Sequence, residues 1–415
     1  MNAFGMTFLL CLCVASLLRL WLSSRHMHYI KAHRDQLPSA FEGQISLDAH
    51  QRAADYTCAK ARLGQASTLL EVVIALGLTF GGGLDLLNLC AAQVSEGMMQ
   101  GLVLLLLTGL LMGLIELPFS WYSTFHIESR FGFNKMTPAL FFKDLAKSLL
   151  LGIALGLPLA SAILWLMEKM GSFWWFDAWL TWMGFNILML ALYPMWIAPL
   201  FNKFTPMDNP ALKERIEALL HRCGFAVKGL MVMDGSIRSS HGNAYFTGFG
   251  KTKRIVFFDT LLERLKVEEV EAVLAHELGH FKCRHVVKRI LLSFAASFFF
   301  LYLLGYVMDK PWFYSGLNVT TASTAMTLIL FFLVTPHFTF LLQPLMSAYS
   351  RQHEFEADQY AAAHANPADL VNALTKLYND NASTLTPDPL HSMFYDSHPP
   401  ALIRIGKLQP NTPLS

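Results

Sequence analysis

The stretch LAHELGHFKCRHVVKRILLSFAASFFFLYLLGYVM, residues 274–308, contains the two features that decide the fold. Its first part contains the pattern HExxH, at His276, Glu277 and His280, which is typical of a zinc hydrolase. Its last nineteen residues, 290–308, carry no charged side chain, and about 20 predominantly apolar residues suffice to cross a bilayer. The stretch therefore predicts a hydrolytic metal site directly beside a membrane-spanning helix.

The composition of the whole chain also indicates a membrane protein. Of its 415 residues, 54% are hydrophobic and 15% are charged, whereas about a quarter of the residues in a soluble domain are charged. The formal net charge of +2 gives no nucleic-acid footprint. The six cysteines are scattered and form no CxxC pair, which argues against a disulfide framework and against a cysteine zinc ribbon.

Seven segments are long and apolar enough to span a bilayer, at residues 3–22, 69–90, 101–120, 148–167, 178–200, 288–308 and 325–347. The first contains Arg19, which can reach the interface from a helix end. The second contains Glu71, Asp85 and three consecutive glycines. Basic residues follow the first apolar run and do not precede it, so we expect no cleavable signal peptide. The sequence therefore predicts a protein with seven transmembrane helices.

The distribution of lysine and arginine predicts the orientation in the membrane. Basic residues gather in 23–68, 121–147 and 201–287, and they are sparse in the connections between the other spans. By the positive-inside rule, the N-terminus should lie outside, and the active site and C-terminus on the cytoplasmic side. Aspartate and histidine within predicted spans, at Asp85 and His337, are functional candidates to which we assign no role.

Four regions follow from this pattern: a membrane region of five spans with a basic cytoplasmic loop (1–200), a cytoplasmic metalloprotease segment (201–287), two further spans (288–347) and a C-terminal cytoplasmic segment (348–415). In the second region, Asn209 is the expected N-cap of a helix that Gly224 ends. The stretches NAYFTGF and RIVFFD flank residues 250–253 and predict a β-hairpin. We expect the HExxH pattern on a helix at 267–285, and the last region to begin as a helix and then turn irregular.

The HExxH spacing predicts the chemistry of the site. On a helix, His276 and His280 present their nitrogens to one point, and catalytic zinc takes three protein ligands. Glu277 is rotated by about 100° from His276, where it can act as general base towards water. The alternative is a helix with two surface histidines. His285 lies off the ligand face and is interpreted as a membrane-interface residue.

The third ligand should come from the stretch RQHEFEAD, which offers His353, Glu354, Glu356 and Asp358. Glu354 and Asp358 are four residues apart, so one can bind zinc while the other orients a ligand histidine. Glu356 points nearly the opposite way. Ligand chemistry favours Glu354 over His353, and the alternative is that these carboxylates form a solvated face.

Six stretches resemble those of one known family: LPFSWYSTFHIESRFGFNKMTP (117–138), YPMWIAPLFNKFTPM (193–207), SSHGNAYFTGF (239–249), HELGH (276–280), EFEAD (354–358) and SHPPALIRI (397–405). In this order they resemble the type I CAAX prenyl proteases, a family of seven-span membrane zinc metalloproteases. The first hundred residues match only as spans and a basic loop.

The resemblance implies roles for individual residues. Glu354 falls on the third zinc ligand and Asp358 on its supporting aspartate. His241 and Asn243 match positions that line the substrate cleft beside an edge strand. His398 and Arg404 match the histidine and arginine that close the site, with His398 expected to stabilise the oxyanion. The family usually has glutamate where this chain has Ile403, which leaves the partner of Arg404 open.

The fold class implied is an all-α polytopic membrane protein whose seven transmembrane helices enclose a chamber, with a small cytoplasmic α+β metalloprotease domain that has a β-hairpin edge strand. The expected activity is hydrolysis of peptide bonds near the cytoplasmic face, with one zinc ion per chain. Expected partners are membrane lipid and a peptide or protein substrate, with or without a lipid group, and no nucleic acid. A bacterial inner membrane is the preferred location, and the endoplasmic reticulum is the alternative for a eukaryotic source.

Two other functions fit the same sequence. One is a quality-control protease that needs no prenyl group and uses the same zinc chemistry. The other is a seven-span transporter or receptor in which zinc is structural. The sequence does not give the natural substrate, the cleavage position or the oligomeric state.

Overall fold

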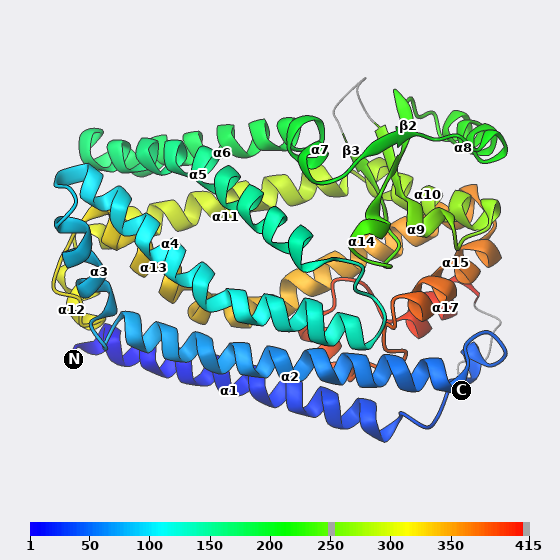
Figure 1. Ribbon diagram of the computed structural model, residues 1–415, viewed down its shortest axis with the longest axis horizontal. Coiled ribbons are helices and arrows are strands. Elements are labelled where there is room, and N and C mark those ends of the chain that lie inside the picture. Colours follow the sequence, from blue (N-terminus) through cyan, green and yellow to red (C-terminus); the bar gives the residue numbers. More distant parts are fainter. Residues whose placement is uncertain (248–253, 410–415) are drawn as a thin grey trace.

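The computed structural model describes residues 1–247 and 254–409. The protein has a long helical part and a small mixed domain (Figure 1). Long helices run side by side along the longest axis, and a small mixed domain with strands β2 and β3 and helices α8, α9 and α10 lies at one end. Within the described residues, seven helices are long and apolar enough to cross a membrane. This agrees with the predicted fold class.

The helices of the long part are α1 (Ala3–Ala32), α2 (Leu47–Leu78), α3 (Gly83–Ala92), α4 (Gly97–Tyr122), α5 (Pro138–Lys169), α6 (Trp174–Leu192), α7 (Ala198–Phe201), α11 (His285–Met308), α12 (Pro311–Gly316) and α13 (Thr324–Thr339). Short π-helical turns, Ser123–Glu128 and Tyr193–Ile197, extend α4 and α6. Most of these helices run past the apolar segments that predicted them, because hydropathy marks only the part of a helix that suits lipid.

The second of the predicted spans is present, but its predicted bounds, 69–90, and those of the basic loop, 23–68, are wrong. Helix α2 begins at Leu47 and ends at Leu78, and the short helix α3 begins only at Gly83. Between them Gly82 has a φ of +74°, a left-handed backbone that glycine adopts without steric cost. The basic residues of the predicted loop lie mostly on α1 and α2, which run side by side (Figure 1).

The sheet of the mixed domain has the strand order β1-β2-β4-β3, with β1 (Phe204–Pro206), β2 (Gly229–Met233), β3 (Ala244–Thr247) and β4 (Arg254–Phe258). Strands β2 and β4 pair in parallel, and the other two pairs are antiparallel. The β3–β4 pair is the predicted hairpin, and β3 forms an edge of the sheet. Residues 248–249 of NAYFTGF and the connection at 250–253 lie outside the described residues. Ile255, Val256 and Phe257 of β4 are all buried, as expected for a strand covered on both faces.

The remaining helices are α8 (Pro210–Arg222), α9 (Asp259–Leu262), α10 (Val267–Lys282), α14 (Gln343–His364), α15 (Pro367–Asp380), α16 (Pro389–Tyr395) and α17 (Ala401–Leu408). Helix α8 begins as predicted, because the Asn209 side chain accepts a hydrogen bond from the Leu212 backbone N–H at 3.1 Å. The helix predicted at 267–285 ends earlier, at Lys282, and α11 begins at His285. The described part of the C-terminal region, 348–409, is helical for much of its length and not irregular.

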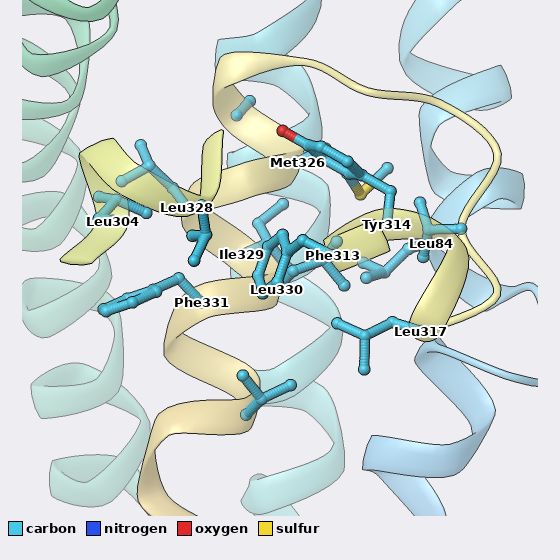
Figure 2. Close-up of a cluster of buried hydrophobic side chains, with 14 of the residues drawn as sticks. Leu84, Leu304, Phe313, Tyr314, Leu317, Met326, Leu328, Ile329, Leu330 and Phe331 are labelled. Atoms are coloured by element: carbon cyan, nitrogen blue, oxygen red, sulfur yellow. The ribbon is translucent and has the colours of Figure 1, made fainter. Parts of the chain in front are cut away.

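A large apolar cluster holds the membrane helices together at the end far from the mixed domain. Figure 2 shows side chains of α3, α11, α12 and α13 packing against one another, among them Leu84, Leu304, Phe313 and Leu330. The one polar group that Tyr314 brings into this cluster is satisfied, because its hydroxyl donates to the Met308 carbonyl at 2.6 Å. Apolar packing therefore joins the membrane helices at this end, and the Tyr314 hydroxyl also lies 2.6 Å from Thr327 Oγ1 of α13.

Candidate metal centre

Two helices, α10 and α14, carry the donor atoms of the candidate site, and they pack closely. A side chain on Gly279 would not fit between them, because a Cβ there would lie 2.8 Å from the Cα of Ala357. Helix α10 is fixed at its start by Glu269, whose carboxylate accepts a hydrogen bond from the Lys266 backbone N–H at 2.7 Å. The absent side chain at Gly279 therefore lets the histidines of α10 approach the carboxylates of α14.

His276, His280 and Glu354 bring three donor atoms together. The Nε2 atoms of His276 and His280 lie 3.2 Å apart. Glu354 Oε2 lies 3.4 Å from His276 Nε2, and Glu354 Oε1 lies 3.3 Å from His280 Nε2. Two atoms bound at about 2.05 Å to one tetrahedral zinc ion lie roughly 3.3 Å apart. The residues therefore fit a zinc ion, with Glu354 and not His353 as the third donor.

The burial of the Glu354 carboxylate also fits a metal ion at this position. The residue is 2% exposed, and its Oε2 atom has no hydrogen-bond partner among the described residues. A buried carboxylate oxygen without a partner is costly unless an ion satisfies it. The atom thus marks a position where a cation is expected.

Asp358 orients His276. Its Oδ1 lies 2.8 Å from His276 Nδ1, so that this nitrogen carries the hydrogen and Nε2 keeps its lone pair for a metal. Asp358 also accepts two hydrogen bonds from Arg404, from Nε at 2.8 Å and Nη2 at 2.6 Å. Asp358 is therefore the partner of Arg404, which the sequence left open because of Ile403. Arg404 is 5% exposed, which places it behind the metal ligands, and its predicted substrate contact stays a prediction.

His285 orients His280 in a similar way, which corrects its interpretation as an interface residue. His280 Nδ1 lies 2.9 Å from His285 Nδ1, and His285 Nε2 lies 3.0 Å from Glu356 Oε2. If His280 donates from Nδ1, His285 accepts at Nδ1 and donates from Nε2 to Glu356. Sequence spacing missed this pair, because a helix break at Arg284 turns His285 back towards His280. The left-handed φ of +57° at Arg284 marks that break.

Glu277 and His398 stand beside the donor atoms. Glu277 is adjacent to His276 on α10 and is half-buried, and burial raises the pKa of its carboxyl above the usual value. His398 precedes α17, and its Nε2 lies 3.4 Å from Glu354 Oε1. The His398 side chain is 63% exposed, so a bound substrate can reach it.

His276 is the buried histidine of the site. Burial disfavours its charged form, but the nearby carboxylates of Asp358 and Glu354 outweigh that effect and raise the pKa of His276 to about 9. A metal ion that binds His276 at neutral pH must therefore displace a proton from the ring.

His241 and Asn243 line a separate cavity of about 930 Å³ between α1, α2 and the mixed domain. His241 Nδ1 lies 3.0 Å from Asn381 Oδ1, and its Nε2 lies 3.5 Å from Glu128 Oε2. The Asn243 side chain accepts a hydrogen bond from the Ala244 backbone N–H at 2.8 Å, at the start of β3. Both residues thus lie where the edge strand meets the cavity, and none of their contacts joins them to the three metal donors.

The chain matches two family models that adjoin. The first, described as the CAAX prenyl protease N-terminal region with five membrane helices, matches residues 26–203. The second, peptidase family M48, matches residues 206–412.

Similar proteins include named proteases and one solved structure. The CAAX prenyl protease 1 homolog of Arabidopsis thaliana is 41% identical over 70% of this chain and 69% of its own length. CAAX prenyl protease 1 of Saccharomyces cerevisiae is 34% identical over 92% of this chain and 90% of its own. The crystal structure of S. mikatae Ste24p superposes with a TM-score of 0.92 at 30% identity, covering 99% of this chain and 100% of that one.

Proposed function

Because this chain belongs to peptidase family M48, in its CAAX prenyl protease branch, and is a multi-pass membrane metalloprotease, we propose that His276, His280 and Glu354 hold one zinc ion that serves hydrolysis. The observation that carries this proposal is the close approach of donor atoms from the three residues: the two Nε2 atoms lie 3.2 Å apart, and each lies 3.3 or 3.4 Å from one oxygen of Glu354. Asp358 and Arg404 act behind these donors, where they keep His276 in the tautomer that binds metal.

A zinc ion at these donors would act as a Lewis acid that makes water a better nucleophile and polarises the substrate carbonyl. Glu277 accepts a proton from the attacking water on a carboxylate oxygen, and later donates it to the nitrogen of the departing amine. Its raised pKa favours the first of these steps, because a carboxylate with a higher proton affinity is a stronger base. His398 donates a hydrogen bond to the oxygen of the tetrahedral intermediate. Its exposure at the site supports this role.

The substrate is proposed to bind as an extended strand. Strand β3 has an unpaired edge within the described sheet, and such an edge gives main-chain hydrogen bonds to a peptide. His241 and Asn243 lie where that edge meets the cavity and are proposed to contact the peptide. A lipid group on the substrate, as on a prenylated CAAX protein, is part of this proposal, and its support is the names of the relatives together with a site beside membrane helices.

The topology is proposed from charge. The N-terminus lies outside, and the donors and C-terminus lie on the cytoplasmic side, in a bacterial inner membrane or in the endoplasmic reticulum of a eukaryote. The proposed regions are 1–200, 201–287, 288–347 and 348–415. Support for the first boundary comes from the two family models, which meet between residues 203 and 206.

The test compares detergent-purified wild type with Glu277→Gln, after the zinc content of each has been measured. Both receive a quenched CAAX peptide, once farnesylated and once unmodified. We expect one zinc per chain in both proteins, and cleavage by wild type alone. Activity in Glu277→Gln would refute the assigned base. Faster cleavage of the farnesylated peptide would support CAAX processing, and equal rates would support a quality-control protease.

A further inference from the structure

A second cluster of metal-binding side chains lies beside the first. Cys283 caps the C-terminal end of α10, His285 begins α11 and Glu356 belongs to α14. One donor atom from each of the three lies within 4.8 Å of the other two. The three donors come from three helices, so the packing that aligns His280 with Glu354 also brings them together. None of the roles proposed above uses the thiol of Cys283.

The histidine of this cluster is held rigidly. His285 is 1% exposed, and its ring stacks on that of His353 with centroids 3.9 Å apart and an angle of 11° between the planes. Tyr349, one turn earlier on α14, packs against His353 with ring centroids 4.2 Å apart. Because the imidazole cannot swing away, its Nε2 atom remains directed at Glu356, 3.0 Å from the carboxylate. Donors of one tetrahedral ion lie at about that separation.

We propose that Cys283, His285 and Glu356 form a second metal site that takes zinc or another soft divalent ion when such an ion is in excess. A thiolate, an imidazole and a carboxylate are ligands that suit zinc, cobalt and cadmium, and the sulfur disfavours magnesium and calcium. On binding, the Cys283 thiol releases its proton to solvent, and the ion replaces the hydrogen between His285 Nε2 and Glu356.

Occupation of this site opposes metal binding at the first. With an ion on Nε2, a neutral His285 carries its hydrogen on Nδ1. That hydrogen then faces the Nδ1 hydrogen of His280 across 2.9 Å, so that two donors meet where a donor and an acceptor met before. His280 must turn or lose its orienting bond, which weakens it as a ligand. The second site is therefore inhibitory, and since coupling is reciprocal, an ion at the first site also weakens binding at the second. This coupling rests on the proposed zinc at His280, whereas binding by Cys283 does not.

Cobalt tests the binding without any assay of hydrolysis. Cobalt is added in excess to the full chain in detergent, and the thiolate-to-cobalt charge-transfer band is recorded in the near ultraviolet. The first site contains no sulfur, so it cannot give this band. We expect the band in wild type and in the control Cys90→Ser, whose thiol is exposed on α3, and we expect none in Cys283→Ser. No band in wild type, or an equal band in Cys283→Ser, would overturn the proposal.

Zinc inhibition tests the coupling. Hydrolysis of the quenched peptide is measured against free zinc, starting from protein with one equivalent bound. We expect wild type and Cys90→Ser to lose activity as zinc rises. Cys283→Ser should keep its basal rate and need at least tenfold more zinc for the same loss. Equal inhibition of all three proteins would refute the coupling. A cobalt band in a protein that hydrolyses no peptide would support the second site and count against the proposed function only.

Discussion

The buried carboxylate of Asp358 offers the sharpest test of how the site is held together. It is 4% exposed, contacts His276 at 2.8 Å and accepts two hydrogen bonds from Arg404, which is 5% exposed. The substitution Asp358→Asn keeps the shape but removes the charge. It takes away the acceptor that orients a candidate metal ligand, and it leaves the buried guanidinium of Arg404 with only the more distant carboxylate of Glu354, 3.8 Å away.

The two losses have different sizes. Removing one partner of a buried ion pair costs about 3–5 kcal/mol in the free energy of unfolding. Loss of the residue that orients a ligand histidine lowers metal affinity about 10- to 100-fold, which corresponds to roughly 1.4–2.7 kcal/mol. Asparagine still offers an oxygen to His276 or to Arg404. The losses of stability and of metal affinity should therefore lie towards the lower end of these ranges.

The assay separates the two effects. Zinc affinity is measured by competition with a chelator, and stability by the unfolding midpoint in detergent, with Asp208→Asn as an exposed control. Asp358→Asn should lose both affinity and stability. Adding Arg404→Met to it should restore part of the stability, because the unpaired charge is gone, without restoring affinity. Wild-type zinc affinity in Asp358→Asn would refute the reasoning that Asp358 orients His276.

Three further results are expected at the same site. Glu277→Gln should retain its zinc and lose about 10²- to 10⁴-fold in hydrolysis rate, the usual contribution of a general base, and a milder loss in steady-state kinetics would contradict its role. Gly279→Ala should destabilise the protein by about 1–3 kcal/mol, because the new Cβ meets Ala357 at 2.8 Å and forces α10 from α14; an unchanged unfolding midpoint would show that the helices can yield. Because the pKa of His276 is raised to about 9, the apparent zinc affinity should rise about tenfold per pH unit up to that value. Calorimetry at several pH values measures this affinity. An affinity that does not change with pH would show that no proton is displaced.

The sequence brought the candidate metal donors together because their spacing follows directly from helix geometry. His276 and His280 share a helical face at four residues apart, and EFEAD offers carboxylates at the same spacing. The pair of His285 and Glu356 was missed for the opposite reason. Its geometry depends on the left-handed residue Arg284, which lies between α10 and α11, and no periodicity records such a break.

The same contrast appears in the membrane region. Strongly apolar spans such as 101–120, in which Glu116 is the single charged residue, were found because hydropathy alone defines them. Helix α2 was misplaced, because its sequence mixes lipid-facing and charged residues while the next apolar run continues across Gly82 into α3. A window that averages hydropathy joins the two pieces, whereas the left-handed glycine separates them. Burial of Arg404 against Asp358 was also beyond the sequence, since it depends on how α17 docks against α14.

The proposed binding of a peptide in the cavity beside His241 and Asn243 would make water a participant in substrate binding. At about 30 Å³ for each molecule in the liquid, its volume of about 930 Å³ corresponds to roughly thirty waters. A peptide that fills the cavity returns this water to the bulk. The binding equilibrium must then depend on the chemical potential of water, so an osmolyte too large to enter would lower KM simply by drawing solvent out.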